Sequence, residues 1–388
     1  MDEEFNPWNG RDIVKIGKLD FSTIAMKKPL LISSEGKFIS VAQAAETPSL
    51  SRGSLFSLSE DLQAKLTLER YSLEPDFNLG IVGTGLYTRQ DVMEHIRNRT
   101  EFGRLAIRAE MGYCNELASA IQSRSLPAWP KPTFKPVKEF EWWKPVQKCI
   151  HLLLKNRALF CENTTDSVAA PIANWRINNI HPVFTQQGFT VLCNSGVDNT
   201  RANFESKVKS VLVTYVGGVG HGNYDRYTGH WSEVILQIGN YDTSEVRKKA
   251  FHFLSCRTGR DLGPDTVQHE ARVYCGYDEN FTFVWDNTTT PVNEFVLFVQ
   301  ADGTFDQFMA SGVKASDAYN ATIGAFNAAI AQVPNTTAAT WLTYDRDHLR
   351  LHGDGNTTIK PHRWVKICFP IHHWILEDHL VRAGVLEN

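Results

Sequence analysis

Two residues that can do covalent chemistry follow short apolar runs in the middle of the chain. His221 follows the run VLVTYVGGVG, and Cys256 follows the run AFHFLS. A cysteine attacks a carbonyl carbon as the thiolate, and a neighbouring imidazole can accept the thiol proton. This pair therefore predicts a cysteine nucleophile with a histidine base, provided that the fold brings both residues to one place.

The two apolar runs predict the elements that must position this pair. Residues 211–216 and 250–254 are continuous apolar stretches of strand length, which is typical of buried strands in a parallel sheet. Helix-forming residues at 244–249 suit the crossover that parallel neighbours need. Because ligands bind outside the carboxyl ends of such strands, we expect His221 and Cys256 to face one cleft.

The neighbouring sequence predicts the rest of an α/β domain. Alternating apolar and polar segments favour a right-handed βαβ unit before residue 216 and further strands and helices after Cys256. The strands expected are 189–193, 272–277, 281–285 and 349–354, with an apolar run of β-favouring residues at 292–300; the helices expected are 201–209, one beginning at Pro264, and 303–332.

The order of these parts resembles the caspase/gingipain-type cysteine peptidases of clan CD. In both, a strand ending in His-Gly precedes a strand ending in a small residue and Cys. The segment LSCRTGRDLGPDTVQHEARVYCGYDENFTF is more similar to the gingipain and CHAT branch than to animal caspases. The resemblance covers residues 186–356, under half of the chain. It implies a caspase-like, mostly parallel sheet flanked by helices.

The resemblance also implies roles for the matching residues. His221 is the expected base and Cys256 the expected nucleophile. The backbone N–H groups of Gly222 and Cys256 are expected to form the oxyanion hole, because Gly222 has no side chain to keep a substrate away. No Cys or His pair has ligand spacing, so we expect neither a metal nor a cofactor.

Four charged residues are the candidates for substrate binding. In caspase-like enzymes the loops after the first strand and around the His and Cys shape the pocket for the residue before the cleaved bond. Here these loops contain acidic Asp198 and Asp225 together with basic Arg201 and Arg257. Since both signs are present, the sequence leaves the preferred charge open, with Asp198 slightly favouring a basic substrate residue.

The composition narrows the partners and the compartment. The 388 residues carry a formal net charge of −3, which gives no electrostatic reason to expect nucleic acid. No window approaches the length of uninterrupted apolar sequence that spans a membrane. The seven cysteines are scattered and odd in number, and the N-terminus is acidic. These features favour reduced thiols and a cytoplasmic protein without a secretory signal.

Changes in composition predict four regions. Residues 1–125 form a mixed α+β N-terminal region whose role the sequence leaves open. Residues 126–185 begin with a proline-rich linker and continue as a helical extension that ends near Lys155. Residues 186–358 form the caspase-like peptidase domain, and residues 359–388 form a tail that docks back on the body.

Two local patterns stand out in the N-terminal region. Gly83 and Gly85 form a Gly-x-Gly without the third glycine of a dinucleotide fingerprint, so they predict a turn. Thr88 and Asp91 predict a capping box at the start of the longest helical pattern. Arginines on one flank of that pattern indicate either a solvated face or a docking surface for an acidic partner: Arg97, Arg99, Arg104 and Arg108.

These observations favour a cysteine endopeptidase acting on a specific protein partner, with the first 185 residues supplying recognition of a regulatory partner or control. The alternative is a catalytically inactive caspase-like scaffold or recruitment module. The presence of both His221 and Cys256 counts against the scaffold. A hydrolase or acyltransferase acting on a small molecule would use the same two residues and also stays open.

Overall fold

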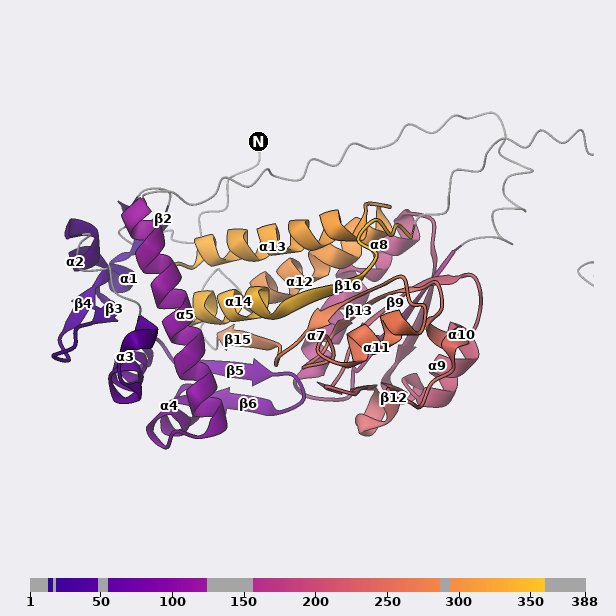
Figure 1. The fold of residues 1–388 in the computed structure, drawn as a ribbon, viewed down its shortest axis with the longest axis horizontal. Helices are drawn as coiled ribbons and strands as arrows, with labels where there is room; N and C mark the ends of the chain where they lie inside the picture. Colours follow the sequence, from indigo (N-terminus) through magenta and orange to yellow (C-terminus); the bar gives the residue numbers. More distant parts are fainter. Residues whose placement is uncertain (1–12, 17–18, 48–54, 124–155, 287–293, 360–388) are drawn as a thin grey trace, which may run out of the picture.

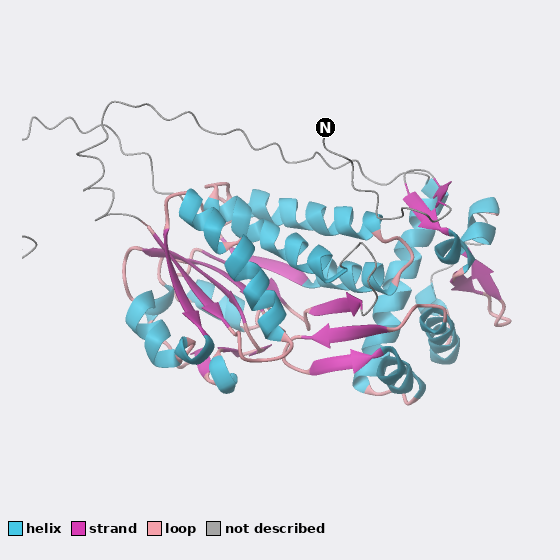
Figure 2. Ribbon diagram, turned by 180° about the vertical axis from the view of Figure 1, so that it is seen from behind, coloured by secondary structure: helices cyan, strands magenta, loops and turns pink. Residues whose placement is uncertain are grey.

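The computed structural model describes residues 13–16, 19–47, 55–123, 156–286 and 294–359. An α/β part built on a large sheet lies at one end of an elongated molecule, and the N-terminal helices lie at the other (Figure 1). Long helices from the C-terminal half run between the two parts. Seen from behind, the same arrangement shows the sheet strands and the helices that cover them (Figure 2).

The α/β part is organised around a six-stranded sheet. Its strand order is β16-β14-β13-β9-β7-β8. All neighbours pair in parallel except β16, which runs antiparallel to β14. The strands are β7 (Arg157–Glu162), β8 (Thr190–Ser195), β9 (Val213–Val219), β13 (Ala250–Leu254), β14 (Val273–Tyr277) and β16 (Leu349–Gly353). The mostly parallel α/β sheet that the sequence predicts is thereby confirmed.

Alternate residues of the central strands pack into two separate cores, because successive side chains point to opposite faces of a sheet. One core contains Phe160 and Tyr215 and includes residues of α7, α8 and α12. The other contains Leu159 and Val216 and includes residues of α9, α10 and α11. The helices are α7 (Ala169–Asn179), α8 (His181–Gln186), α9 (Arg201–Val208), α10 (Thr243–Val246), α11 (Leu262–Gln268) and α12 (Glu294–Ala310). Both faces of β9 and β13 are therefore covered.

Two small sheets complete the α/β part and connect it to the N-terminal region. The first is β10 (Gly222–Asn223), β11 (Arg226–Thr228) and β12 (Val234–Gln237), which follows His221. The second has the order β15-β5-β6, from β5 (Phe77–Ile81), β6 (Gly85–Thr88) and β15 (Thr282–Asp286). Because β5 belongs to the N-terminal region and β15 follows β14, the second sheet joins the two ends of the molecule.

Helices surround this junction. The first core also includes buried residues of the N-terminal helices and of the last helices of the chain. These helices are α3 (Glu60–Ser72), α4 (Arg89–Arg97), α5 (Glu101–Ser123), α13 (Ala315–Gln332) and α14 (Thr337–His348). The remaining elements are β1 (Ile13–Ile16), β2 (Leu19–Ser22), α1 (Thr23–Lys27), β3 (Pro29–Ile32), β4 (Phe38–Ser40) and α2 (Val41–Glu46).

The structure corrects the predicted boundary at residue 186. β7 lies between β8 and β9 in the sheet, so the α/β part begins by residue 157 and not at residue 186. The N-terminal region also shares a core with it. A boundary read from local composition misses this because strand pairing and core packing join residues that are far apart in sequence. The predicted linker to residue 155 and the tail after residue 359 lie outside the described residues.

Two local predictions have clear outcomes. The capping box is confirmed: Thr88 Oγ1 accepts the Asp91 N–H at 3.2 Å, and Asp91 Oδ2 accepts the Thr88 N–H at 2.8 Å. The β-favouring run at 292–300 lies largely within α12, where packing of Leu297, Phe298 and Val299 in the core outweighs β propensity. Among the described helices, none combines the length and the apolar character that crossing a bilayer requires.

Candidate active site

The register of the sheet brings His221 and Cys256 to the same edge. β9 and β13 are parallel neighbours, and Val219 lies opposite Leu254 at their carboxyl ends. His221 and Cys256 each come two residues after these paired residues. The Gly220 N–H donates to the Leu254 carbonyl at 3.4 Å, which extends the pairing toward the two residues.

Gly222 lets the loop after β9 lie directly against the loop after β13. A Cβ at this position would lie 2.4 Å from the carbonyl oxygen of Cys256 and 2.7 Å from a side-chain carbon of Thr258. Real Cβ atoms do not approach so closely, so a larger residue would push the two loops apart. Gly222 and Cys256 therefore have adjacent backbones, as the predicted oxyanion hole needs, and the hole itself stays a prediction.

Asp166 is a site residue that the sequence reasoning missed. Its Oδ2 lies 3.4 Å from His221 Nε2. Its Oδ1 accepts the N–H groups of Val168 at 2.9 Å and Ala169 at 2.8 Å, at the start of α7. These bonds hold the carboxylate so that it orients the imidazole. The sequence shows a polar turn after β7. It does not show that β7 lies beside β9, so the turn alone does not identify Asp166 as a neighbour of His221.

The other ring nitrogen of His221 is left without a partner. Nδ1 is buried and has no hydrogen-bond partner among the described residues, while the side chain as a whole is 21% exposed. An imidazole held through one nitrogen by a carboxylate can accept a proton on the other. The pair Asp166–His221 thus has the arrangement of an orienting acid and a base.

Cys256 is buried in this structure, with 2% of its surface exposed. Its Sγ contacts the carbonyl oxygen of Val82 and lies 3.9 Å from that of Phe281. Burial raises the pKa of the Cys256 thiol to about 12. The thiol is therefore protonated at neutral pH in this arrangement, and ionisation requires its surroundings to change.

Asp198 and Arg201 lie at the β8 end of the sheet. Asp198 is exposed, in the turn that follows β8. Arg201 donates to Glu245 Oε2 at 2.5 Å and to Glu245 Oε1 at 2.8 Å, and it also donates to the Ile235 carbonyl at 3.0 Å. These bonds brace α9 against α10 and β12. They explain Arg201 without a substrate, and its predicted substrate contact stays untested.

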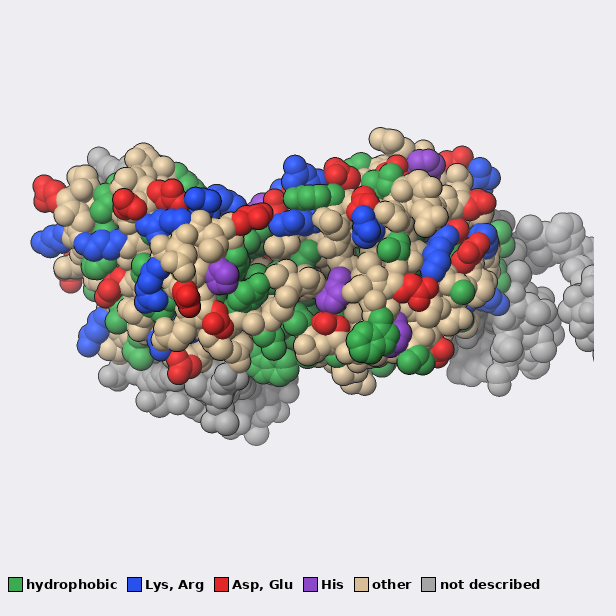
Figure 3. Space-filling model, turned by 90° about the horizontal axis from the view of Figure 1, so that it is seen from below, with side chains coloured by type: hydrophobic (Ala, Val, Ile, Leu, Met, Phe, Trp, Pro, Cys, Tyr) green, Lys and Arg blue, Asp and Glu red, His purple; other side chains and the backbone are tan. Residues whose placement is uncertain are grey.

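Asp225 and Arg257 lie in the segments that follow His221 and Cys256 in the chain. Asp225 pairs with Arg226 at 2.8 Å, and this hydrogen bond holds the pKa of the Asp225 carboxyl below its ordinary value. The Arg257 guanidinium lies 5.2 Å from the centre of the Tyr224 ring and 3.7 Å from Glu279. Because Asp225 and Arg257 have opposite charges, the charge preference stays open. The face of the molecule seen from below likewise carries acidic, basic and histidine side chains (Figure 3).

A buried charge network lies beneath the strands that end at the site. His252, in β13, lies 3.1 Å from Asp306 and 3.3 Å from Asp302. Burial opposes a charged ring, but the two carboxylates outweigh burial and raise the pKa of His252 to about 9. These three side chains lie close enough to hold a metal ion. Arg176, 2.8 Å from Asp306, already supplies positive charge there, so the ion pairs account for the group.

Glu162 connects this network to the end of β9. Its Oε1 lies 3.1 Å from Arg176 Nε and 3.1 Å from His181 Nε2. Its Oε2 accepts the Val219 N–H at 3.1 Å. Because Val219 is two residues before His221, the network helps to set where the loop carrying His221 leaves the sheet.

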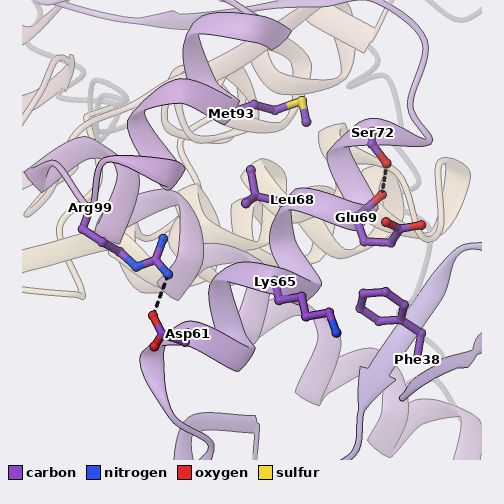
Figure 4. A pocket seen from close by; sticks show the side chains of 8 residues that line it. All are labelled: Phe38, Asp61, Lys65, Leu68, Glu69, Ser72, Met93 and Arg99. Atoms are coloured by element: carbon purple, nitrogen blue, oxygen red, sulfur yellow. Dashed lines mark hydrogen bonds and ion pairs between the residues drawn. The ribbon is translucent and has the colours of Figure 1, made fainter. Parts of the chain in front are cut away.

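A separate pocket of about 460 Å³ lies in the N-terminal region, between β4, α3 and α4 (Figure 4). Arg99 donates to Asp61 at 3.0 Å, and Lys65 lies 5.3 Å from the Phe38 ring centre. Arg104 pairs with Glu60 at 3.3 Å. Acidic residues of α3 thus neutralise part of the predicted basic flank, which favours a solvated face over a docking surface for an acidic partner.

No protein-family model matches the chain, and no curated protein matches it. Among the solved structures that are similar to it, two match 54% of the chain at 10% identity. One is the complex of the RgpB pro- and mature domains from Porphyromonas gingivalis, with a TM-score of 0.36 over 49% of that chain. The other is the Arg-specific cysteine proteinase gingipain R, with a TM-score of 0.34 over 48% of that chain.

The matched region spans about half of each gingipain chain.

Proposed function

We propose that this chain is a cysteine peptidase with Cys256 as nucleophile, His221 as base and Asp166 as the residue that orients the base. The observation that carries the proposal is the parallel register of β9 and β13, which places both residues two positions past the same sheet edge. Two contacts of His221 support it: Nδ1 has no hydrogen-bond partner within the described part of the chain, and Asp166 lies beside Nε2.

The proposed reaction begins when His221 accepts the proton of the Cys256 thiol. The thiolate attacks the carbonyl carbon of a peptide bond, and the N–H groups of Gly222 and Cys256 stabilise the oxyanion. His221 then gives its proton to the leaving amine as the C–N bond breaks. Water hydrolyses the resulting thioester, with His221 taking a proton from the water, and the free thiol is restored.

The proposed substrate is a protein or peptide partner, which is the class that the resemblance implies. Membership of the CHAT branch and a cytoplasmic location remain predictions. The burial of Cys256 supports a second candidate, a catalytically inactive scaffold with the same fold. The two candidates differ in one property, which is whether Cys256 ever reacts in a way that depends on His221.

The test is labelling with electrophilic peptidyl probes that carry Arg, Lys, Asp or Leu at the cleavage position. We expect Cys256→Ala to abolish labelling and His221→Ala to slow it by about 100-fold or more. Cys193→Ala is the matched control, because Cys193 is another free thiol of the same sheet, within β8, and this variant should label as wild type does. Labelling of Cys256 that is indifferent to His221 would favour the scaffold.

A further inference from the structure

The turn between β5 and β6 lies on the candidate dyad. The carbonyl oxygen of Val82 accepts a hydrogen bond from Cys256 Sγ. A Cβ on the next residue, Gly83, would lie 3.5 Å from His221 Nδ1 and 3.6 Å from its Cβ. One short segment of the N-terminal region therefore contacts Cys256 and lies beside His221, and it contributes to the burial of Cys256.

The segment reaches the thiol as an extended strand. β5 pairs antiparallel with β15, with Phe77 opposite Asp286 and Ile81 opposite Thr282. The pairing continues where the Val82 N–H donates to the Phe281 carbonyl at 3.2 Å. Extended peptides commonly bind proteins by adding a strand to a sheet edge in this way. β5 thus occupies the edge of β15 that leads to Cys256, where a substrate strand would lie.

The carbonyl group of Val82 is oriented differently from that of a reacting substrate. A thiolate must approach the carbonyl carbon, with the carbonyl oxygen directed at the oxyanion donors. In this structure the oxygen of Val82 is directed at Sγ and accepts a hydrogen bond from the thiol. The chain then turns away, since Gly83 has a φ of +87° and Gly85 a φ of +147°. The Val82–Gly83 bond is therefore held in an unreactive orientation.

Two features hold the hairpin against β15. Phe283 covers Gly80, where a Cβ would lie 2.3 Å from the ring, and Phe283 itself packs against Phe295 at 5.4 Å between ring centres. The outer strand β6 is less secured, since Leu86 is exposed. The hairpin is thus anchored mainly through β5.

We propose, on the basis of the function proposed above, that the β5–β6 hairpin (residues 77–88) is an internal pseudosubstrate that keeps the peptidase latent. Its displacement from β15 exposes Cys256 and opens the place for an extended substrate strand. The control that the sequence predicts for the N-terminal region is thus exerted by this hairpin. The regulated step is the exchange of one strand for another at the edge of β15.

The first test is Gly80→Ala, which places a methyl group against the Phe283 ring and should loosen β5. Gly324→Ala is the matched control, because a Cβ at Gly324 in α13 meets nothing within 4 Å. We expect Gly80→Ala to raise the rate of Cys256 labelling by iodoacetamide and by a peptidyl probe about tenfold or more. The control should label at the wild-type rate, with the labelled residue identified by peptide mapping.

The second test cross-links β5 to β15, so it does not require a variant in which the hairpin is loosened. Asn78 and Trp285 lie opposite each other on β5 and β15, so Asn78→Cys with Trp285→Cys allows a reversible cross-link. In dilute urea we expect Cys256 to label in the reduced protein and to be protected in the oxidised one. Equal labelling of the two forms would overturn the proposal.

The outcomes distinguish a failure of the pseudosubstrate proposal from a failure of the peptidase proposal on which it rests. If wild type labels at Cys256 with the peptidyl probe as fast as Gly80→Ala does, the hairpin is no inhibitor, while the peptidase function stands. If Gly80→Ala exposes Cys256 to iodoacetamide but the peptidyl probe never reacts, the peptidase function fails, and the pseudosubstrate fails with it.

Discussion

Replacing His252 with Gln tests whether the buried charge network stabilises the strand that leads to Cys256. The ring of His252 is charged at neutral pH because Asp306 and Asp302 raise its pKa to about 9 in spite of burial. The substitution removes that charge and leaves both carboxylates with Arg176 as the nearby cation. Tyr277 and Tyr215 donate hydrogen bonds to the same carboxylates.

The size of the effect follows from the shift in pKa. The ordinary pKa of the histidine side chain is 6.5, and the pKa of His252 in the folded protein is about 9. This shift corresponds to about 3 kcal/mol of stabilisation, at about 1.4 kcal/mol for each pKa unit. Because folding raises this pKa, the stabilisation is fully present below about pH 6.5 and is lost as the pH rises through about 9. The difference in the free energy of unfolding between wild type and His252→Gln should therefore lose most of its size across that range.

The assay is urea unfolding of wild type and His252→Gln at about pH 6, 7.5 and 9. Taking the difference between the two proteins removes the titration of groups that they share. His269→Gln is the matched control, since His269 is a surface histidine 3.5 Å from Asp265, and it should follow wild type at every pH. A free-energy difference between wild type and His252→Gln that does not change with pH would refute the reasoning.

Three further predictions concern single contacts. Asp166→Asn should slow Cys256-dependent labelling by about tenfold or more and change its pH profile, because the orienting charge on His221 is lost; an unchanged profile would contradict that role. Arg201→Ala should lower the free energy of unfolding in urea by about 3 kcal/mol, because buried Glu245 loses its partner; a change in substrate preference without a loss of stability would instead support the predicted substrate contact. Asp345→Asn should raise the thermal midpoint at neutral pH. Burial raises the pKa of Asp345, so keeping its carboxyl group ionised at neutral pH costs stability in the folded protein. A lower midpoint would show that the charge is needed.

Local patterns were sufficient for the elements that carry the proposed dyad. The runs before His221 and Cys256 are apolar throughout, as strands buried on both faces require, and they form β9 and β13. The capping box of Thr88 involves residues three apart, so it is determined within one turn of chain. The helix-forming residues predicted between them include α10, which lies in the crossover that parallel neighbours need.

The remaining parts of the site depend on pairings between distant segments. Asp166 meets His221 only because β7 lies beside β9, and nothing in the sequence around residue 157 specifies that neighbour. Sequence predicts the turn at Gly83, but it does not predict that the turn lies on Cys256.

The sequence by itself therefore determined the alternation of strands and helices, and which strands end in a histidine and a cysteine. These follow from the periodicity and propensity of residues that are close in the chain. Only the tertiary structure decided that Asp166 lies beside His221 and that Val82 covers Cys256. Those contacts depend on which strand edges meet, and that choice is made by the packing of the whole core and not by any one segment.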